Sequence, residues 1–573
     1  MFSIEINNRI YDCNAGETIL DVLRRNQIQV PTFCFLKGHS PTGACRMCVV
    51  EIEGRRNLAA SCSEPVVEGM KIKTHSPRVV EARETILELL LANHPNDCLF
   101  CEKSGHCEFQ KITNQYEVMR GAFPRLDELK AIDDSSPSII RDPNKCILCG
   151  RCVLVCREVE GVAAIDRTGR GGQTVIASSG LIPQGLSRCI NCGQCVLVCP
   201  TGALTESSEI PEVLKALQDP TKKVVAQYAP SVTISLAEEF NLPAGTDLNG
   251  VLNAALRKMG FYRVFDTSFT ADLTILEESA ELIERVTKGG KLPMITSCCP
   301  GWVKFAEEFY PELLPHLSTC KSPQMMMGAM IKSYWAEKER VPLDAIYSVS
   351  FMPCTAKKFE KGRGEMKREE RQDVDSVLTT RELIKLIHFF GIEMDKLTPE
   401  DTDPPFGQRS TAGKIFGASG GVMEAALRTA YEKITGENMT DLTISAVRGL
   451  EGVKEALMKI GNTEVKIGVV SGLKNVKHFL EEVKNGTSDL QFIEVMACPG
   501  GCINGGGQPV EQETDTLIAR MRALYTIDKQ ENLRTSHENP FIQQLYREYL
   551  GEPLSEKSHH LLHTRYLDRS DLE

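Results

Sequence analysis

The chain has 573 residues, of which 42% are hydrophobic and 25% charged, and its formal net charge is −11. This length exceeds what one hydrophobic core supports, so roughly three to five domains are expected. The acidic balance disfavours a nucleic acid or an anionic membrane as partner, since both select clustered lysine and arginine. The start, MFSIEINNRI, alternates like a strand and unlike a signal peptide, and no apolar run approaches the ~20 residues that span a bilayer. We therefore expect a protein of the anaerobic cytoplasm with no membrane span.

Cysteine is the most informative residue type, with 22 in the chain, most of them in four closely spaced blocks. Disulfides are one possible use of these cysteines. Their tight spacing and a reducing cytosol favour thiolate ligands to metal instead.

Residues 1–78 begin with a strand, a turn at Asn7-Asn8, a second strand and a helical pattern from Thr18 to Gln27. Four thiols accompany this order: Cys34, Cys45, Cys48 and Cys62. The arrangement resembles the plant-type ferredoxin (β-grasp) domain, which holds a 2Fe–2S cluster, although ten residues separate the first two cysteines where that family has four. A zinc site would also take four cysteines and stays open as an alternative.

Residues 79–125 contain a helical pattern over Arg83–Asn93 and then a mixed ligand set: His94, Cys98, Cys101 and Cys107. A lone histidine near a helix end is usually a surface or capping residue. Because three cysteines follow it closely, His94 is interpreted as a ligand to a 4Fe–4S cluster, where a neutral nitrogen donor should raise the reduction potential. The motif resembles one in hydrogenases and in the large iron–sulfur subunit of respiratory complex I.

Residues 126–209 contain a repeat, C-x2-C-x2-C-x3-C, whose second copy is followed by Pro200. This is the signature of bacterial two-cluster ferredoxins, in which the fourth cysteine of each copy binds the other cluster. The first 4Fe–4S cluster is thus assigned to Cys146, Cys149, Cys152 and Cys199. The second is assigned to Cys156, Cys189, Cys192 and Cys195.

Residues 210–525 alternate strand-like runs with helical ones. The strand-like runs are Val224–Tyr228, Pro293–Ser297, Ile346–Phe351, Val465–Val470 and Phe492–Ala497, and the helical ones include Ser322–Ala336, Arg381–Phe390 and Gly421–Thr435. This alternation predicts an α/β domain with largely parallel sheets. Strand ends carry the candidate site residues Pro230, Cys298, Cys354 and Cys498, where active sites of open α/β sheets lie. Residues 526–573 are expected to be a helical tail with its histidines at the surface.

Three segments of this domain carry a family resemblance: T-S-Cys298-Cys299-P, M-P-Cys354-T-A-K-K and M-A-Cys498-P-G-G-Cys502. Together they resemble the iron-only (FeFe) hydrogenases, and the resemblance covers nearly the whole chain. It implies an α+β multidomain protein whose last domain holds an H-cluster, a 4Fe–4S cube joined through a cysteine to a two-iron unit with CO, cyanide and azadithiolate. One 2Fe–2S and three accessory 4Fe–4S clusters would accompany it. The implied cube ligands are Cys299, Cys354, Cys498 and Cys502, the last of them bridging.

The same resemblance implies the surroundings of the two-iron unit. Lys357 and the Pro230–Ser231 turn would donate hydrogen bonds to the cyanides, and Gln324 would lie near a carbonyl. Met352, Met496 and Phe416 would form apolar walls. From the residues alone, core packing explains these last three side chains equally well.

Glu278, Glu281 and Arg285 are spaced to project from one helix face. Taken alone, that spacing favours a solvated acidic face with an ion pair. The resemblance implies instead a proton relay, whose members are Cys298, Glu278, Ser318, Glu281 and Arg285. A thiol with a pKa near ~8.5 can pass a proton without binding iron. Cys13 and Cys320 have no assigned role and are expected to be buried hydrophobes.

The implied activity is reversible oxidation of H2 to protons. The chain has no strand–GxGxxG–helix fingerprint, so NAD(P) would be used only through a flavin-containing partner subunit of a hetero-oligomer, with ferredoxin as another electron partner. The complex-I-like segment resembles multimeric, electron-bifurcating hydrogenases. Two alternatives remain, namely an electron-transfer subunit and a regulatory relative without hydrogen turnover.

Overall fold

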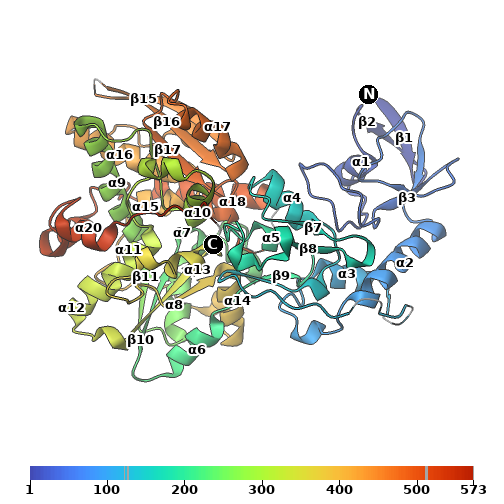
Figure 1. Ribbon diagram of the computed structural model, residues 1–573, viewed down its shortest axis with the longest axis horizontal. Coiled ribbons are helices and arrows are strands. Elements are labelled where there is room, and N and C mark those ends of the chain that lie inside the picture. Colours follow the sequence, from blue (N-terminus) through green and yellow to red (C-terminus); the bar gives the residue numbers. More distant parts are fainter. Residues whose placement is uncertain (120, 122, 126–127, 462, 510–513, 572–573) are drawn as a thin grey trace. The chain divides into compact units, whose positions relative to one another are not determined.

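The computed structural model describes residues 1–119, 121, 123–125, 128–461, 463–509 and 514–571 (Figure 1). These residues form two compact units. The N-terminal unit consists of Met1–Glu158, Ala163–Ser187 and Val198–Thr205. The C-terminal unit consists of Val159–Val162, Arg188–Leu197 and Glu206–Glu573. Among the described residues, none of the helices combines the length and apolarity needed to cross a bilayer.

The N-terminal unit opens with a five-stranded sheet in the order β2-β1-β5-β3-β4. Asn7 and Asn8 both have positive φ (50° and 66°), as the two-residue turn of a twisted hairpin requires. Helix α1 starts after Thr18, which forms a capping box with Asp21. The predicted order of strand, turn, strand and helix is confirmed. The strands are β1 (Phe2–Ile6), β2 (Arg9–Cys13), β3 (Val49–Ile52), β4 (Ala59–Ala60) and β5 (Lys71–Lys73), and α1 is Ile19–Arg25.

Helix α2 starts six residues before the predicted Arg83, at Pro77. Proline is common in the first turn of a helix because the N–H groups of that turn have no acceptor within the helix, so the N–H that proline lacks is not needed. The predicted domain boundary after residue 78 therefore falls inside α2, and the one between 125 and 126 lies at the edge of the described residues. The remaining elements before residue 210 are α2 (Pro77–Asn93), α3 (Glu108–Gln115), β6 (Ile139–Arg141), α4 (Arg151–Glu158), β7 (Ile165–Thr168), β8 (Val175–Ser178), α5 (Gln194–Leu197) and β9 (Leu204–Glu206).

The C-terminal unit contains two four-stranded sheets, which occupy its lower and upper parts in Figure 1. The first, β11-β10-β13-β14, is entirely parallel. In the second, β12-β17-β16-β15, only the edge strand β15 is antiparallel. The predicted α/β domain with largely parallel sheets is confirmed. The strands are β10 (Lys223–Tyr228), β11 (Arg263–Asp266), β12 (Met294–Ile295), β13 (Ile346–Met352), β14 (Ser376–Thr379), β15 (Val453–Ile460), β16 (Thr463–Ser471) and β17 (Phe492–Met496).

Helices cover these sheets, and a π-helical turn at Ile331–Trp335 divides the predicted Ser322–Ala336 helix in two. The predicted boundary after residue 525 falls inside α18. The helices are α6 (Ile210–Gln218), α7 (Pro230–Thr233), α8 (Asn249–Lys258), α9 (Ser268–Lys288), α10 (Pro300–Phe309), α11 (Pro323–Met330), α12 (Ala336–Glu339), α13 (Ala356–Lys361), α14 (Thr380–Phe389), α15 (Thr411–Lys414), α16 (Gly421–Thr435), α17 (Leu473–Lys484), α18 (Thr514–Gln530), α19 (Pro540–Leu545) and α20 (Glu556–Leu562).

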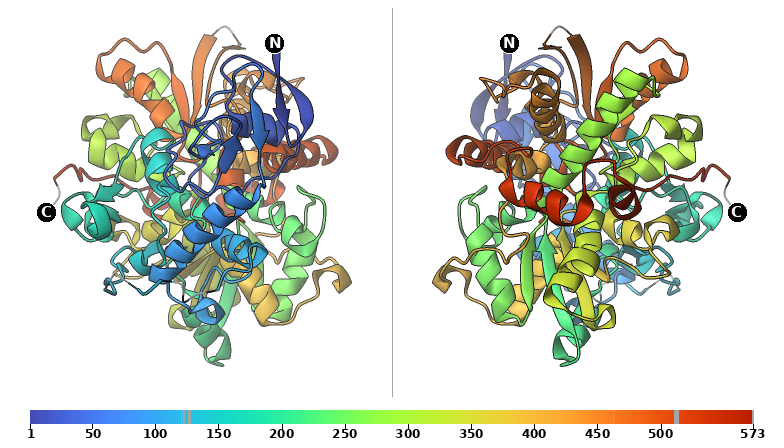
Figure 2. Two further views of the ribbon diagram at one scale, coloured as in Figure 1. Left: turned by 90° about the vertical axis from the view of Figure 1, so that its right-hand side faces the viewer. Right: turned by 90° about the vertical axis from the view of Figure 1, so that its left-hand side faces the viewer.

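The C-terminal helices cross the middle of this unit in the right-hand view of Figure 2, with α19 packed on α9 and α20 on α11. The expectation that the tail histidines all lie at the surface is wrong for His563, which is only 8% exposed. Its ring bonds Glu277 through Nε2 (3.1 Å) and Thr319 through Nδ1 (2.8 Å). The tail sequence gives no sign of these partners, because both are more than 240 residues away.

Candidate metal centre

A cavity in the C-terminal unit is lined by thiols from three distant segments. Cys354 lies two residues beyond β13 and Cys498 two beyond β17, while Cys299 precedes the first turn of α10. Every residue predicted to hold or surround the six-iron group lines this cavity: Pro230, Ser231, Cys298, Cys299, Gln324, Met352, Cys354, Lys357, Phe416, Met496, Cys498 and Cys502. The ends of the strands therefore bring together thiols that lie far apart in the sequence.

The loop between Cys498 and Cys502 needs its glycines. Gly500 and Gly501 have φ of 77° and 94°, a region that favours glycine. A Cβ at Gly501 would lie 2.6 Å from the Ser419 nitrogen and 2.9 Å from the Met496 sulfur. The Pro-Gly-Gly turn thus lets both thiols face the same cavity.

The electrostatics of the cavity fit a bound metal cluster. Burial raises the pKa of Cys354 and of Cys502 to about 12, and neighbouring thiols add to the shift of each. Four buried thiols so close together become thiolates only when a positive charge lies beside them, and bound irons supply that charge. The backbone N–H of Ala497 already donates to the Cys299 sulfur (3.4 Å). The buried Ser231 hydroxyl has no hydrogen-bond partner among the described residues. It is therefore available to donate a hydrogen bond to a group bound in the cavity.

Lys357 projects into the cavity from α13 with its orientation fixed. Its ammonium donates to the Cys298 carbonyl (3.1 Å) and to Glu360 (2.9 Å). Although burial opposes it, Glu360 holds the pKa of Lys357 above its ordinary value. Gln324 also donates to Glu360 (3.0 Å) and accepts from Ser350 (2.9 Å). Glu360 is a site residue that the sequence analysis missed, although its i,i+3 spacing from Lys357 was a usable signal.

The predicted relay residues lie in one buried row behind Cys298. Ser318 donates to Glu281 (3.0 Å), which also accepts from Arg285 (2.6 Å). Burial, then Glu281, raises the pKa of Glu278 to about 8, while the neighbouring Ser318 side chain opposes that shift. Burial, then Glu278, raises the pKa of the Cys298 thiol.

The interpretation of this row as a solvated acidic face is wrong. Glu278 and Glu281 are 1% and 7% exposed. Glu284 on the same helix is exposed and pairs with Lys288.

The raised pKa of Glu278 predicts a pH-dependent stability. A carboxyl whose pKa is higher in the folded state stabilises the fold below its unfolded pKa, ordinarily 4.5, and this contribution is lost as pH rises through about 8. Glu278→Gln cannot ionise, so its thermal midpoint should rise relative to the parent protein between about pH 5 and pH 9. Exposed Glu284→Gln is the control and should show no such trend. Parallel curves for Glu278→Gln and the parent protein would contradict the raised pKa.

The N-terminal unit gathers two further thiol sets. A second cavity is lined by all four cysteines assigned to the first ferredoxin cluster, Cys146, Cys149, Cys152 and Cys199. Near the first sheet, Cys34 hydrogen bonds with Cys45 and Cys62, and Cys48 with Cys62. Both sets have the composition of a cluster site.

The His94 motif lies between α2 and α3. His94 caps α2 and its ring contacts Phe109 (centroids 5.0 Å apart). The Cys107 thiol donates to the Pro200 carbonyl (3.5 Å). Cys156 belongs to the N-terminal unit, whereas Cys189, Cys192 and Cys195 belong to the C-terminal unit. Both of these ligand sets stay predictions.

Two buried charged groups near the Cys189–Cys195 loop were not foreseen. Lys304 donates to the Cys189 carbonyl (2.7 Å). Glu160 is 1% exposed, neither carboxyl oxygen has a partner among the described residues, and burial raises its pKa well above the ordinary value. Lys304 also pairs with Glu308 at i,i+4, a spacing that the sequence shows, but its contact with Cys189 spans 115 residues and has no such signal.

Comparison with protein families divides the chain into five matches. Residues 222–506 match "Iron only hydrogenase large subunit, C-terminal domain" and residues 514–569 match "Iron hydrogenase small subunit". Residues 1–77 match a 2Fe–2S binding domain, 83–121 the NADH-ubiquinone oxidoreductase-G iron–sulfur region, and 145–203 a 4Fe–4S dicluster domain.

Two relatives match along their whole length. The NADP-reducing hydrogenase subunit HndD of Solidesulfovibrio fructosivorans is 46% identical, with all of both chains covered. Iron hydrogenase 1 of Clostridium pasteurianum is 40% identical over 99% of this chain and 100% of that protein. Among solved structures, the apo [FeFe]-hydrogenase HydA1 of Chlamydomonas reinhardtii has a TM-score of 0.58 at 40% identity, covering 63% of this chain and 99% of that one.

Proposed function

Because the chain belongs to the iron-only (FeFe) hydrogenase family, we propose that its C-terminal cavity is the site of reversible H2 oxidation. One observation carries this proposal. A single cavity is lined by four thiols from three distant segments, together with a fifth thiol, Cys298, and the side chain of Lys357.

Cys299, Cys354, Cys498 and Cys502 would hold the cube, with Cys502 bridging to the two-iron unit. When bound, this group supplies iron with an open coordination position and a nearby base, the chemistry that splits H2 heterolytically. The chain itself would orient this group, exclude water from the pocket and transfer protons.

The two-iron unit would be oriented by hydrogen-bond donors whose side chains are already held in place. Lys357 is held by Glu360, so its ammonium is positioned for a charge-assisted hydrogen bond to an anionic ligand such as cyanide. The unpartnered Ser231 hydroxyl is a second donor, and Gln324 is anchored through Ser350 and Glu360. Met352, Met496 and Phe416, each at most 7% exposed, exclude water.

Protons would move between the cavity and solvent through the buried row. The Cys298 thiol passes a proton to Glu278, and Ser318 connects Glu278 to Glu281. Arg285, whose side chain is 12% exposed, is the outermost member. With its pKa raised to about 8, Glu278 can both accept and release a proton near neutral pH.

Electrons would travel through one 2Fe–2S and three accessory 4Fe–4S clusters on the ligand sets given above, His94 included. With the six-iron group, these ligand counts correspond to roughly 20 irons per chain.

We further propose that this chain works with a flavin-containing, NADP-binding partner subunit and with ferredoxin, in an electron-bifurcating hetero-oligomer. The relative HndD is named as a subunit of an NADP-reducing hydrogenase. This chain carries no dinucleotide-binding fingerprint, so NADP would be bound by another subunit. Co-purification of a flavin-containing subunit supports the proposal, and full activity of a monomer with ferredoxin alone contradicts it.

The function itself is tested on the matured protein. Infrared bands of CO and cyanide should appear together with viologen-linked H2 uptake and evolution. Bands without turnover would favour a regulatory protein, and clusters without such bands would favour an electron-transfer subunit.

A further inference from the structure

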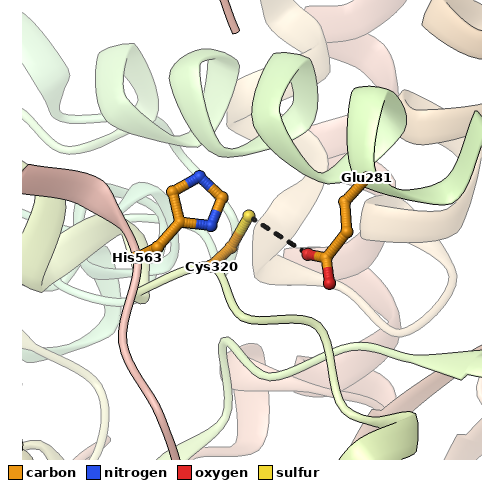
Figure 3. Close-up of side chains that lie close together, drawn as sticks. All are labelled: Glu281, Cys320 and His563. Atoms are coloured by element: carbon orange, nitrogen blue, oxygen red, sulfur yellow. Dashed lines mark hydrogen bonds between the residues drawn. The ribbon is translucent and has the colours of Figure 1, made fainter. Parts of the chain in front are cut away.

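Three potential metal ligands meet outside the cavity. Glu281 comes from α9, Cys320 from the segment before α11, and His563 from the residue after α20. One ligand atom of each lies within 4.8 Å of the other two, and all three residues are buried. Figure 3 shows the three side chains converging, with a ring nitrogen of His563 and the carboxylate of Glu281 on either side of the Cys320 sulfur. The sulfur lies 4.0 Å from Glu281 Oε2.

The histidine ring is oriented as metal-binding histidines usually are. Its Nε2 bonds the Glu277 carboxylate, leaving Nδ1 on the side of Thr319 and Glu281. Glu277 is itself fixed by the Tyr546 hydroxyl (2.5 Å) and the Leu554 N–H (2.8 Å). A carboxylate that bonds one ring nitrogen fixes the ring and makes the other nitrogen a better ligand. A cation bound to Nδ1 would replace its hydrogen bond with Thr319 (2.8 Å).

The charges of the three ligands match a divalent cation. One thiolate and one carboxylate neutralise two positive charges, so the filled site would carry no net charge in its buried position. A sulfur, nitrogen and oxygen set suits zinc, with a water in the fourth position. Zinc ligand atoms lie roughly 3.5 Å apart, so closing the site needs shifts of about 1 Å.

The site lies just beneath the surface. The side chains of Glu281 and His563 are 10% and 4% exposed. The ring of exposed His559 covers that of His563, with centroids 4.3 Å apart. An exposed side chain therefore borders the site.

We propose that Glu281, Cys320 and His563 form a zinc-type cation site that blocks proton transfer when filled. Its effect on turnover rests on the proposed function, because Glu281 belongs to the proposed relay and a bound cation would occupy its carboxylate. The binding itself does not depend on that function.

The test uses holoenzyme with its clusters assembled, treated with one equivalent of zinc chloride and then desalted. Zinc content should be close to one per chain in the parent protein and strongly reduced in Cys320→Ser. Zinc-edge X-ray absorption should show one sulfur and two or more lighter ligands. H2 evolution should fall at least about tenfold and recover with a chelator. Cys13→Ser, at a buried cysteine of the N-terminal unit, is the matched control and should retain zinc.

Equal zinc content in the parent protein and Cys320→Ser, or a sulfur-free coordination shell, would overturn the site. Cys320→Ala gives a second removal of the thiol if the serine variant does not fold. Zinc bound as expected without loss of turnover would overturn the blocking role. If the enzyme makes no H2 even before zinc is added, the proposed function fails, while the zinc content still decides whether the site exists.

Discussion

Glu278→Gln should lower both H2 uptake and H2 evolution by at least about 100-fold while leaving the metal clusters in place. The carboxyl is 1% exposed, and it lies between the Cys298 thiol and the Ser318–Glu281 pair. A glutamine keeps the size and polarity but cannot accept and release a proton. Turnover is then limited by proton transfer, whatever the state of the cofactor. Cys298→Ala should have a similar effect for the same reason.

The measurement is viologen-linked activity alongside iron content and the infrared spectrum. Glu284→Gln is the control, since this glutamate is on the same helix but exposed and should retain full activity. Near-normal activity in Glu278→Gln would show that protons leave by another route. Loss of the infrared bands would show that the variant is inactive because it lacks the cofactor.

Cys498→Ser should abolish hydrogen turnover and lower the iron content of the chain. The cube would keep three thiolates, and a serine hydroxyl at this buried position is a poor replacement for the fourth. Without the cube, Cys502 has no partner cluster to bridge, so the two-iron unit should be lost as well. Iron analysis and the infrared spectrum follow both effects.

Cys13→Ser is again the control, because this cysteine is buried but lies outside every proposed ligand set. Retention of full iron and turnover by Cys498→Ser would exclude Cys498 as a ligand. A drop of only one accessory cluster would assign it to a different set.

Much of the site could be predicted because its chemistry depends on short motifs. The thiols of Cys354 and Cys498 follow strands that the sequence pattern identifies, β13 in one sheet and β17 in the other. Active sites of α/β sheets lie beyond the carboxyl ends of such strands, which is where both thiols were expected. Five strands of this unit, β10, β12, β13, β16 and β17, were predicted because buried strands form continuous apolar runs. The strands β11, β14 and β15 were not predicted.

What was missed depends on contacts between distant segments. Glu277 and His563 form a buried pair 286 residues apart, and neither shows a pattern along the chain that indicates a partner. Glu281 was placed on the correct face, but its burial depends on the segment around Thr319, which local periodicity cannot detect. Glu160 is a buried carboxyl without a hydrogen-bond partner among the residues that the structure describes. Such a group is costly and therefore rare, so sequence reasoning has no basis for expecting one.

Diffraction data collected at the iron absorption edge from the matured protein give the most direct test of the central claim. We predict a compact group of six irons inside the cavity, bounded by the sulfurs of Cys299, Cys354, Cys498 and Cys502, with Cys298 beside it but unligated. Iron confined to the ferredoxin-like motifs, with none in this cavity, would contradict the account.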